Sequence, residues 1–360
     1  MKHRQTGLTK VGLINPDGHA IGVDIGATAV RAAILSPGTH EGRPSVTVHG
    51  LGQVQLPKGA VNNGVVIDQA VVTTALKELW SSYRFECRNV ILGITNQQLV
   101  VRDMTMPNLE PEQRAKALPF QAREIVALPM EQVLIDFTQL GEPDPQTNTV
   151  SGLLVATPRQ PVLSAVQAVE KAKLKVARVD LSSFAALRSI ADEQLSVEAV
   201  IDMGAHMTNI VIHNLGVPKV VRTILRGGDE LTQAVAENLE MPWSEAEAAK
   251  AGVGLTGQPA PIAKVLNDAI RPLLAEIRSS IHYFGSTNNG ATLERISLTG
   301  GASRLPGLGK ALSDQLGIPT NVITPMQHIR NRWASKDLTA EEADNRATAV
   351  SIGLAMGAAA

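Results

Sequence analysis

The sequence has only one cysteine, Cys87, among its 360 residues. A single cysteine excludes an intramolecular disulfide as well as Cys₄ and Cys₂His₂ metal sites, and it is typical of a reducing compartment. The chain also lacks a large net charge of either sign, since its formal charge is −1 at pH 7. It has no basic run that would bind nucleic acid or an anionic membrane surface, so we expect no nucleic-acid partner.

The sequence also lacks an apolar stretch long enough to cross a membrane. The most apolar tail, residues 347–360, is 14 residues of mostly Ala and Gly, whereas a membrane-spanning helix needs about 20. Residues 1–18 are charged and lack the apolar core of a secretory signal. We therefore expect a cytoplasmic protein without direct membrane insertion, whose association with a membrane would have to come through a partner.

One short pattern is present twice, as IGVDIGATAVRAAIL at 21–35 and as AVIDMGAHMTNIVIH at 199–213. Each copy is an apolar strand that ends in Asp, followed by a Gly-containing turn, a nearby hydroxyl residue and a second apolar run. These residues are Asp24, Gly26 and Thr28 in the first copy and Asp202, Gly204 and Thr208 in the second. Glycine lets backbone N–H groups approach phosphate oxygens, and the Asp would bind Mg²⁺, commonly through water. Two such hairpins predict two related halves that clamp a nucleoside triphosphate with Mg²⁺.

A third glycine-containing turn follows an apolar strand in ISLTGGASRLPGL, at 296–308. Gly300 and Gly301 have no side chain, so a flat ligand such as an adenosine base and ribose could lie against the backbone. Taken alone, the same residues would also suit an ordinary strand-to-helix turn that needs a positive φ.

Hydrophobic periodicity predicts an extra unit between the two hairpins. In the first half we expect a strand at 46–55, a helix that begins near Asp68 and a strand at 89–95. A β-α-β-β-α unit follows, in which Pro119 would kink the first helix. Its expected elements are a strand at 98–106, a helix from Pro111, strands at 133–140 and 150–157, and a helix at 160–173. We expect this unit to be an inserted subdomain, after which a helix at 181–193 returns to the first half.

The second half is predicted to be richer in helix. A strand, KVVRTIL, follows the second hairpin, and a mostly helical section covers about 231–284. Apolar residues from Ile262 to Ile281 recur at helical spacing over about five turns, with Pro272 as an interruption. A helix at 308–316 and a closing helix of small residues at 347–358 complete the prediction.

The three turns, in this order, resemble the phosphate-1, phosphate-2 and adenosine motifs of the superfamily of actin, heat-shock chaperone ATPases and sugar kinases. Within it the chain is similar to the FtsA-like branch, and specifically to the PilM family of actin-like proteins of type IV pilus assembly. The resemblance covers about 20–357 and includes RGGDELTQAVAENLEM and ATAVSIGLAMGA. It implies an α/β, two-lobed actin-like (ribonuclease H-like) ATPase fold with an FtsA-type subdomain 1C insertion.

The resemblance also implies a division into subdomains. The expected bounds are 20–95 and 180–197 for subdomain 1A, 96–179 for 1C, 198–222 and 294–346 for 2A, 223–293 for the mostly helical 2B, and 347–360 for the closing helix.

Carried over residue by residue, the resemblance implies ATP and Mg²⁺ as ligands, with Asp24 and Asp202 holding the metal through water. The phosphate-binding residues would be Asp24, Gly26, Ala27, Thr28, Asp202, Gly204 and Thr208. The adenosine-binding residues would be Gly227, Gly228, Glu247, Lys250, Gly300, Gly301 and Ser303. Lys250 could alternatively lie on a solvated helix face.

Two positions depart from the pattern of the family. His206 stands at a phosphate-2 position that is usually small, and Met356 stands where relatives often have Arg. No residue identifies itself as the group that would position water for hydrolysis. The catalytic residues are therefore unknown, and the sequence predicts ATP binding with weak or absent turnover.

The resemblance implies a membrane partner as well. PilM proteins bind the cytoplasmic N-terminal segment of PilN, a bitopic inner-membrane protein, in a groove between 1A and 1C. Here the groove would involve about 99–157, and it would place the chain at the inner face of the cytoplasmic membrane with other pilus assembly-platform proteins.

Two alternatives in the same superfamily stay open at this point. An FtsA-like cell-division scaffold would end in a basic amphipathic membrane helix, whereas this chain stops at GLAMGAAA. A sugar or small-molecule kinase would need a catalytic Asp beside polar sugar-binding residues, and no such cluster is present before Asp202. A Rossmann dinucleotide enzyme is excluded because no Gly-x-Gly-x-x-Gly follows the first strand.

Overall fold

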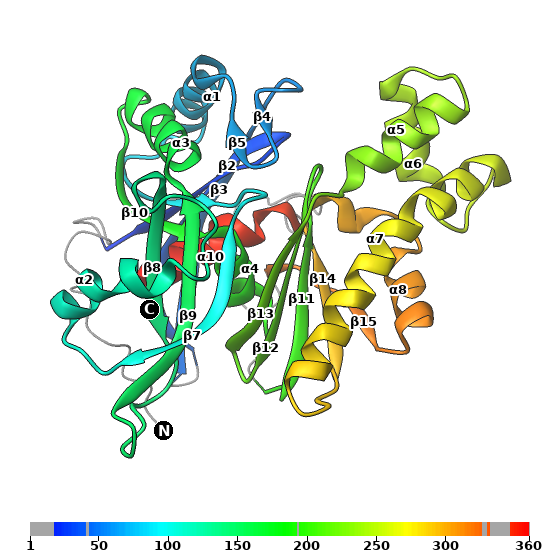
Figure 1. Cartoon of the computed structure of the whole chain (residues 1–360). Helices are drawn as coiled ribbons and strands as arrows, with labels where there is room; N and C mark the ends of the chain where they lie inside the picture. Colours follow the sequence, from blue (N-terminus) through cyan, green and yellow to red (C-terminus); the bar gives the residue numbers. More distant parts are fainter. Residues whose placement is uncertain (1–17, 41–42, 193, 326–329, 332–345, 360) are drawn as a thin grey trace.

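The computed structural model describes residues 18–40, 43–192, 194–325, 330–331 and 346–359. Figure 1 shows two lobes side by side, each built on its own β-sheet with helices packed against it. The observed architecture is the expected two-lobed α/β fold.

The two sheets share one topology, which confirms the prediction of two related halves. In the first lobe the order is β10-β6-β1-β2-β3, extended by the two-residue β16. In the second lobe the order is β13-β12-β11-β14-β15. In both, three consecutive antiparallel strands are followed by two strands parallel to the first of them. The carboxyl ends of β1 and β11, each followed by a Gly turn, therefore have equivalent places in the two sheets.

The strands of the first sheet are β1 (Ala20–Ile25), β2 (Ala29–His40), β3 (Arg43–Gln55), β6 (Asn89–Ile94), β10 (Lys175–Leu181) and β16 (Arg330–Asn331). Those of the second are β11 (Val197–Met203), β12 (Thr208–Asn214), β13 (Val217–Ile224), β14 (Arg295–Thr299) and β15 (Thr320–Val322). A small hairpin, β4 (Val61–Asn62) and β5 (Val65–Val66), precedes the first helix.

Helices cover both faces of the first sheet because alternate residues of its strands point to opposite sides. Ile21 and Val23 pack toward α1 (Gln69–Ser82) and α3 (Arg159–Lys171). Ala20 and Ala33 pack toward α4 (Ser182–Ile190) and the closing helix α10 (Ala349–Ala359). The Asp68 carboxylate caps α1 by accepting hydrogen bonds from the N–H groups of Ala70 and Val71, as expected for a helix that begins there.

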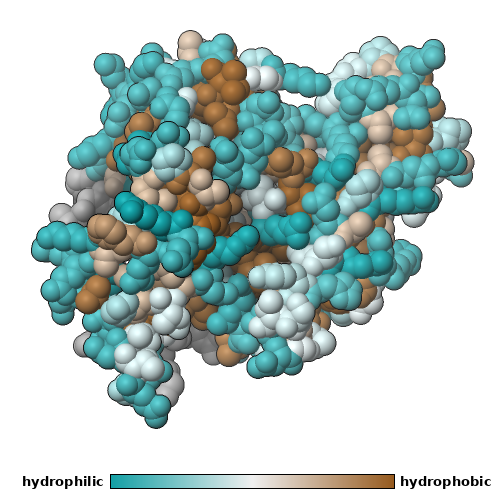
Figure 2. Space-filling view, in the orientation of Figure 1, coloured by the Kyte–Doolittle hydropathy of each residue, from teal (hydrophilic) through white to brown (hydrophobic). Residues whose placement is uncertain are grey.

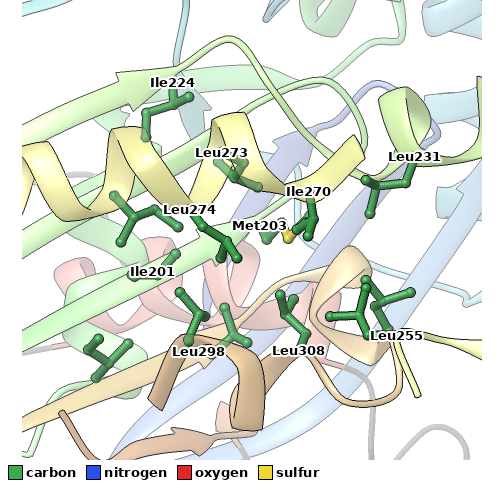
Figure 3. Close-up of a cluster of buried hydrophobic side chains, with 14 of the residues drawn as sticks. Ile201, Met203, Ile224, Leu231, Leu255, Ile270, Leu273, Leu274, Leu298 and Leu308 are labelled. Carbon is green, nitrogen blue, oxygen red and sulfur yellow. The ribbon is translucent and has the colours of Figure 1, made fainter. Parts of the chain in front are cut away.

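The core of the second lobe lies between its sheet and the long helix α7 (Ala260–Thr287). Figure 3 shows Ile270, Leu273 and Leu274 of α7 facing Ile201 and Leu298 of the sheet. The predicted apolar face is therefore confirmed, and α7 continues through Pro272 without ending. Three further helices complete the lobe: α5 (Gly228–Asn238), α6 (Trp243–Val253) and α8 (Leu308–Leu316).

The inserted unit is smaller than expected. It is an antiparallel sheet of order β7-β9-β8 with α2 packed on one face. Its elements are β7 (Val100–Pro107), α2 (Pro111–Ala122), β8 (Val133–Gln139) and β9 (Thr149–Pro158). The expected last helix of the unit, α3, instead packs against α1 in the core of the first lobe. The strand β10, which the sequence analysis did not predict, pairs in parallel with β6.

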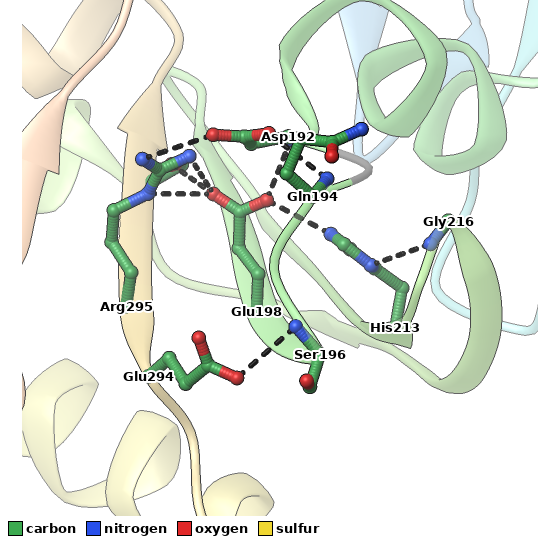
Figure 4. A network of polar contacts seen from close by, with 9 residues as sticks. Asp192, Gln194, Ser196, Glu198, His213, Gly216, Glu294 and Arg295 are labelled. Carbon is green, nitrogen blue, oxygen red and sulfur yellow. Dashed lines mark hydrogen bonds and ion pairs between the residues drawn. The ribbon is translucent and has the colours of Figure 1, made fainter.

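A buried polar network fixes the linker that joins the two lobes (Figure 4). The Glu198 carboxylate of β11 accepts hydrogen bonds from the Asp192 N–H of the linker (2.9 Å), from the Arg295 guanidinium (2.7 and 3.0 Å) and from the Ser297 hydroxyl. It also bonds His213 Nε2 at 2.9 Å, and because His213 Nδ1 accepts from the Gly216 N–H, the ring proton is on Nε2. Every carboxylate oxygen of this buried side chain is therefore satisfied.

Helices α4 and α10 approach so closely that one position requires glycine. A Cβ at Gly353 would lie 1.8 Å from the backbone oxygen of Ala185. We expect Gly353→Val to lower the free energy of unfolding by about 3 kcal/mol, because the two helices would have to separate. Urea denaturation followed by circular dichroism measures this change.

The matched control is Gly252→Ala in α6, where a Cβ would meet no atom within 4 Å. This change should be neutral or stabilise by up to about 1 kcal/mol through helix propensity. Equal effects of the two substitutions would contradict the packing argument.

Candidate functional site

The two Asp-x-Gly hairpins form turns of the same length. The Gly26 N–H donates to the Ala29 carbonyl at 3.0 Å, and the Gly204 N–H donates to the Met207 carbonyl at 2.9 Å. Across the hairpins, Asp24 pairs with Arg31 and Asp202 pairs with Asn209. The two turns therefore correspond position by position.

This register corrects one pairing that the sequence suggested. Counting from each Gly, the counterpart of Thr28 is His206, and the counterpart of Thr208 is Val30. Thr208 is fully buried, and its hydroxyl donates to the Arg226 carbonyl at 2.8 Å. Its hydroxyl thus stabilises the base of the turn, whereas Thr28 is exposed at the tip.

Both turns line a cavity of about 410 Å³ between the lobes. The expected site residues that line it are Asp24, Gly26, Ala27, Thr28, Asp202, Gly204, Gly228, Glu247, Lys250, Gly300 and Gly301. Thr208, Gly227 and Ser303 are next to the lining but are not part of it. A cavity of this size, lined by bare backbone and by charged side chains of both signs, is suited to one small polar ligand.

Two carboxylates and one guanidinium dominate the electrostatics of the cavity. Burial raises the pKa of Asp24, and Arg31 partly offsets this. Burial and the neighbouring Asp24 raise the pKa of Asp202 to about 7, again against the effect of Arg31. Arg31 Nη1 lies 3.9 Å from Asp24 Oδ2, and Arg31 Nε is buried without a hydrogen-bond partner among the residues that the structure describes.

This donor set fits a hydrated divalent cation with an anionic ligand. A cation near Asp24 and Asp202 would relieve the cost of two buried like charges, and an anion would use the unsatisfied Arg31 donor. Within the described ranges no cluster of three or more His, Cys, Asp or Glu residues could hold a metal. Mg²⁺ would therefore complete its shell with water and ligand oxygens, as it usually does.

The third turn packs directly against Asp202. Gly300 has a φ of +88°, and a Cβ there would lie 2.4 Å from Asp202 Oδ1, so both conformation and space require glycine. A Cβ at Gly301 would come no closer than 3.9 Å to another atom, so its backbone faces open space. The Ser303 hydroxyl is buried and donates to the Gly300 carbonyl at 2.7 Å, which fixes the turn.

Lys250 lies inside the protein, so its alternative place on a solvated helix face is wrong. Its Nζ donates to Gly228 O at 3.1 Å, to Thr232 Oγ1 at 2.8 Å and to Glu247 Oε2 at 2.7 Å. It thereby joins α6 to the start of α5. Gly227 precedes α5, and a Cβ there would lie 2.4 Å from the Ala205 carbonyl oxygen of the second turn.

The cavity contains charged and polar residues that the sequence analysis did not assign. They are Arg31, Thr95, Ser182, His206, Asn209, Asp229 and Arg304. The signal for Arg31 and Asn209 was available, since the antiparallel register of each hairpin places them opposite Asp24 and Asp202. His206 lies in the second turn itself, and Asp229 and Arg304 directly follow the expected site residues Gly228 and Ser303. Only Thr95 and Ser182 come from segments that the tertiary fold alone brings to the cavity.

Comparison with known proteins agrees with this geometry. The FtsA cell division protein of Streptococcus pneumoniae is 21% identical to this chain, over 95% of this chain and 83% of its own length. A solved PilM-PilN type IV pilus biogenesis complex matches with a TM-score of 0.82 and 24% identity, over 95% of this chain and 98% of that chain. MreB5 of Spiroplasma citri, solved with ADP, matches with a TM-score of 0.51 and 13% identity, over 92% and 94%.

These matches show the actin-like ATPase fold. In the described part of the chain, no helix is long and apolar enough to cross a membrane. The model of the type IV pilus assembly protein PilM family matches residues 22–359, which is nearly the whole chain. The chain belongs to the PilM family of type IV pilus assembly proteins.

Proposed function

We propose that this protein is an ATP-binding scaffold of the type IV pilus assembly platform, docked at the inner face of the cytoplasmic membrane by a PilN-like protein. The observation that carries the nucleotide part is the cavity between two matched Asp-x-Gly turns. Support for the partner comes from the PilM-PilN complex, whose fold this chain shares.

In this proposal the nucleotide lies across the cavity. Asp24 and Asp202 hold Mg²⁺ through water, and Arg31 binds phosphate oxygens. The N–H groups of Gly26 and Gly204 are used within their own turns, so the residues that follow them, Ala27 and Ala205, supply the backbone N–H donors. The adenosine lies against the open Gly301 backbone, with Glu247 at its edge. MreB5 was solved with ADP, which supports a nucleotide in a fold of this type.

Isothermal titration calorimetry of the purified full chain with ATP tests the nucleotide part, with Mg²⁺ and with EDTA. We expect saturable binding that weakens strongly when the metal is removed, because two carboxylates would then face the phosphates. An absence of heat and of any thermal shift with Mg·ATP would overturn this part.

The partner is proposed to bind where the first lobe faces the inserted unit. We take residues 96–158 as the inserted unit. Figure 2 shows hydrophobic residues gathered on the first lobe between α3 and the inserted sheet. Leu163 of α3 is 39% exposed. Leu134 of β8 is half-buried and, by strand alternation, points to the face of its sheet opposite α2. Two apolar walls of this kind suit a short segment with apolar side chains.

We expect Leu163→Asp to weaken binding of a synthetic PilN N-terminal peptide at least tenfold, because the carboxylate would be desolvated in the interface. Fluorescence anisotropy of a labelled peptide measures the affinity. The control is Tyr283→Asp, where Tyr283 is 55% exposed on α7, which Figure 1 shows on the side of the second lobe away from the inserted unit. Equal affinity of the Leu163 variant and the wild type would place the peptide elsewhere.

A further inference from the structure

His206 stands at the phosphate end of the cavity, at the position that matches Thr28 of the other turn. It lines the main cavity and also a second, more open cavity of about 610 Å³ on the other side of its turn. The second cavity includes Gly227 but none of Glu247, Lys250, Gly300 and Gly301. His206 therefore forms part of the wall shared by the two cavities, within the second phosphate turn.

The His206 ring has one partner and one unsatisfied nitrogen. Its Nε2 lies 3.2 Å from Asp229 Oδ2. Its Nδ1 is buried and has no hydrogen-bond partner within the described part of the chain. Asp229 lies in the first turn of α5, and its own N–H donates to the Ala205 carbonyl at 2.9 Å. The ring is thus held at one edge only, between the second turn and the start of α5.

The charges around the ring explain why a donor is needed there. Asp24, Asp202 and Asp229 all line the main cavity, so a terminal phosphate at this end would meet several carboxylates. Mg²⁺ offsets the first two, but Asp229 belongs to a different element and is balanced only by the His206 ring in the described contacts. A ring with hydrogen on both nitrogens donates to two acceptors, so it would bind Asp229 through Nε2 and a phosphate oxygen through Nδ1 and separate the two anions.

We propose that His206 makes the site select a nucleoside triphosphate over a diphosphate, by donating from its unpartnered Nδ1 to the terminal phosphate while its Nε2 keeps the contact with Asp229. This inference rests on the proposed nucleotide function and assigns one residue of that site to its specificity. A diphosphate would leave the His206–Asp229 contact as it is and would give Nδ1 no acceptor. His206 stands where the family usually has a small residue, and in this proposal it is a specificity determinant.

The test is calorimetry of the full chain with Mg·ATP and with Mg·ADP, on the wild type, His206→Ala and His206→Gln. We expect His206→Ala to weaken Mg·ATP about tenfold and to change Mg·ADP by less than about twofold, as loss of one hydrogen bond to a charged group requires. His206→Gln should retain most of the ATP preference, because its amide supplies an N–H donor of similar reach. The control is His282→Ala, an exposed histidine of α7, which should change neither affinity.

The outcomes separate this inference from the function on which it rests. If the wild type binds neither nucleotide, the proposed function fails and the inference fails with it. If the wild type binds both but His206→Ala keeps the same ratio of affinities, only the inference is overturned. An equal loss of both affinities in a folded His206→Ala protein would also overturn it, because His206 would then be a structural residue.

Discussion

Asp202→Asn should make the unliganded protein more stable at pH 8 and at the same time remove its response to Mg·ATP. In the folded chain the pKa of Asp202 is raised from 3.8 to about 7, first by burial and then by the neighbouring Asp24. Above pH 7 the protein therefore keeps a carboxylate ionised in a place that disfavours the charge. A difference of about three pH units corresponds to roughly 4 kcal/mol of lost stability.

The sign of the pH dependence follows from the raised pKa. Between pH 4 and pH 7 the folded chain holds a proton on Asp202 that the unfolded chain has released, so stability falls as pH rises through this window. Asn carries no charge and removes this dependence. The stability gain of Asp202→Asn should therefore be largest at pH 8 and should shrink toward pH 5.

Ligand binding should narrow the difference in stability between the two proteins at pH 8, without closing it at the concentration used here. Mg·ATP at 100 times its dissociation constant stabilises the wild type by about 2.7 kcal/mol, whereas Asp202→Asn should gain almost nothing because it has lost a metal-holding carboxylate. Differential scanning fluorimetry at pH 5 and pH 8, with and without Mg·ATP, measures both effects. The control is Asp268→Asn on α7, an exposed carboxylate paired with Lys264, which should leave the ligand response intact. A destabilised Asp202→Asn protein at pH 8 would contradict the argument.

The sequence was sufficient for those features that depend on local chemistry. Both hairpins, the Asp68 cap and the apolar face of α7 were predicted, because apolar runs, turn glycines and a helical period of 3.6 act within one segment. The two similar hairpins also predicted two related halves, whereas the fold itself was implied by the resemblance of the three turns to the motifs of the actin superfamily.

Features that depend on pairing between distant segments were missed. The strand KVARVDL at Lys175–Leu181 has no regular alternation, and it becomes a strand because β6 offers a parallel edge. For the same reason α3 was assigned to the inserted unit, although its buried face completes the core beside α1. Thr28 corresponds to His206 and not to Thr208, and this could be recognised only from the observed register of the two turns.

Glu198→Ala should be among the most destabilising single changes in the protein, with a loss of about 3–5 kcal/mol. Burial raises the pKa of Glu198, but hydrogen bonds from His213, Ser297, the Asp192 N–H and Arg295 outweigh burial and lower it to about 2. Alanine would leave the Arg295 guanidinium and the His213 N–H without their shared acceptor (Figure 4). It would also release the Asp192 N–H, so the linker between the lobes would lose one of its anchors.

The depressed pKa gives this prediction a second, independent signature. A carboxyl group with a pKa of about 2 when folded and 4.5 when unfolded contributes its full stability above pH 4.5. This contribution, roughly 3 kcal/mol, is lost as pH falls from 4.5 to 2. The wild type should therefore lose more stability than Glu198→Gln over this range, since the amide has no charge to lose.

Urea denaturation at pH 7 and pH 3 separates the two effects. The matched control is Glu294→Gln, which affects the same linker through an exposed hydrogen bond of 3.1 Å to the Ser196 N–H. It should cost less than about 1 kcal/mol, because water can replace an exposed partner whereas nothing replaces Glu198. If Glu198→Ala and Glu294→Gln were equally mild, the buried network would not be what fixes the linker. A large loss of unfolding free energy in Glu198→Ala alone would show that this one buried charge fixes the linker between the two lobes. Glu198 lies at the end of its sheet that is away from the nucleotide cavity.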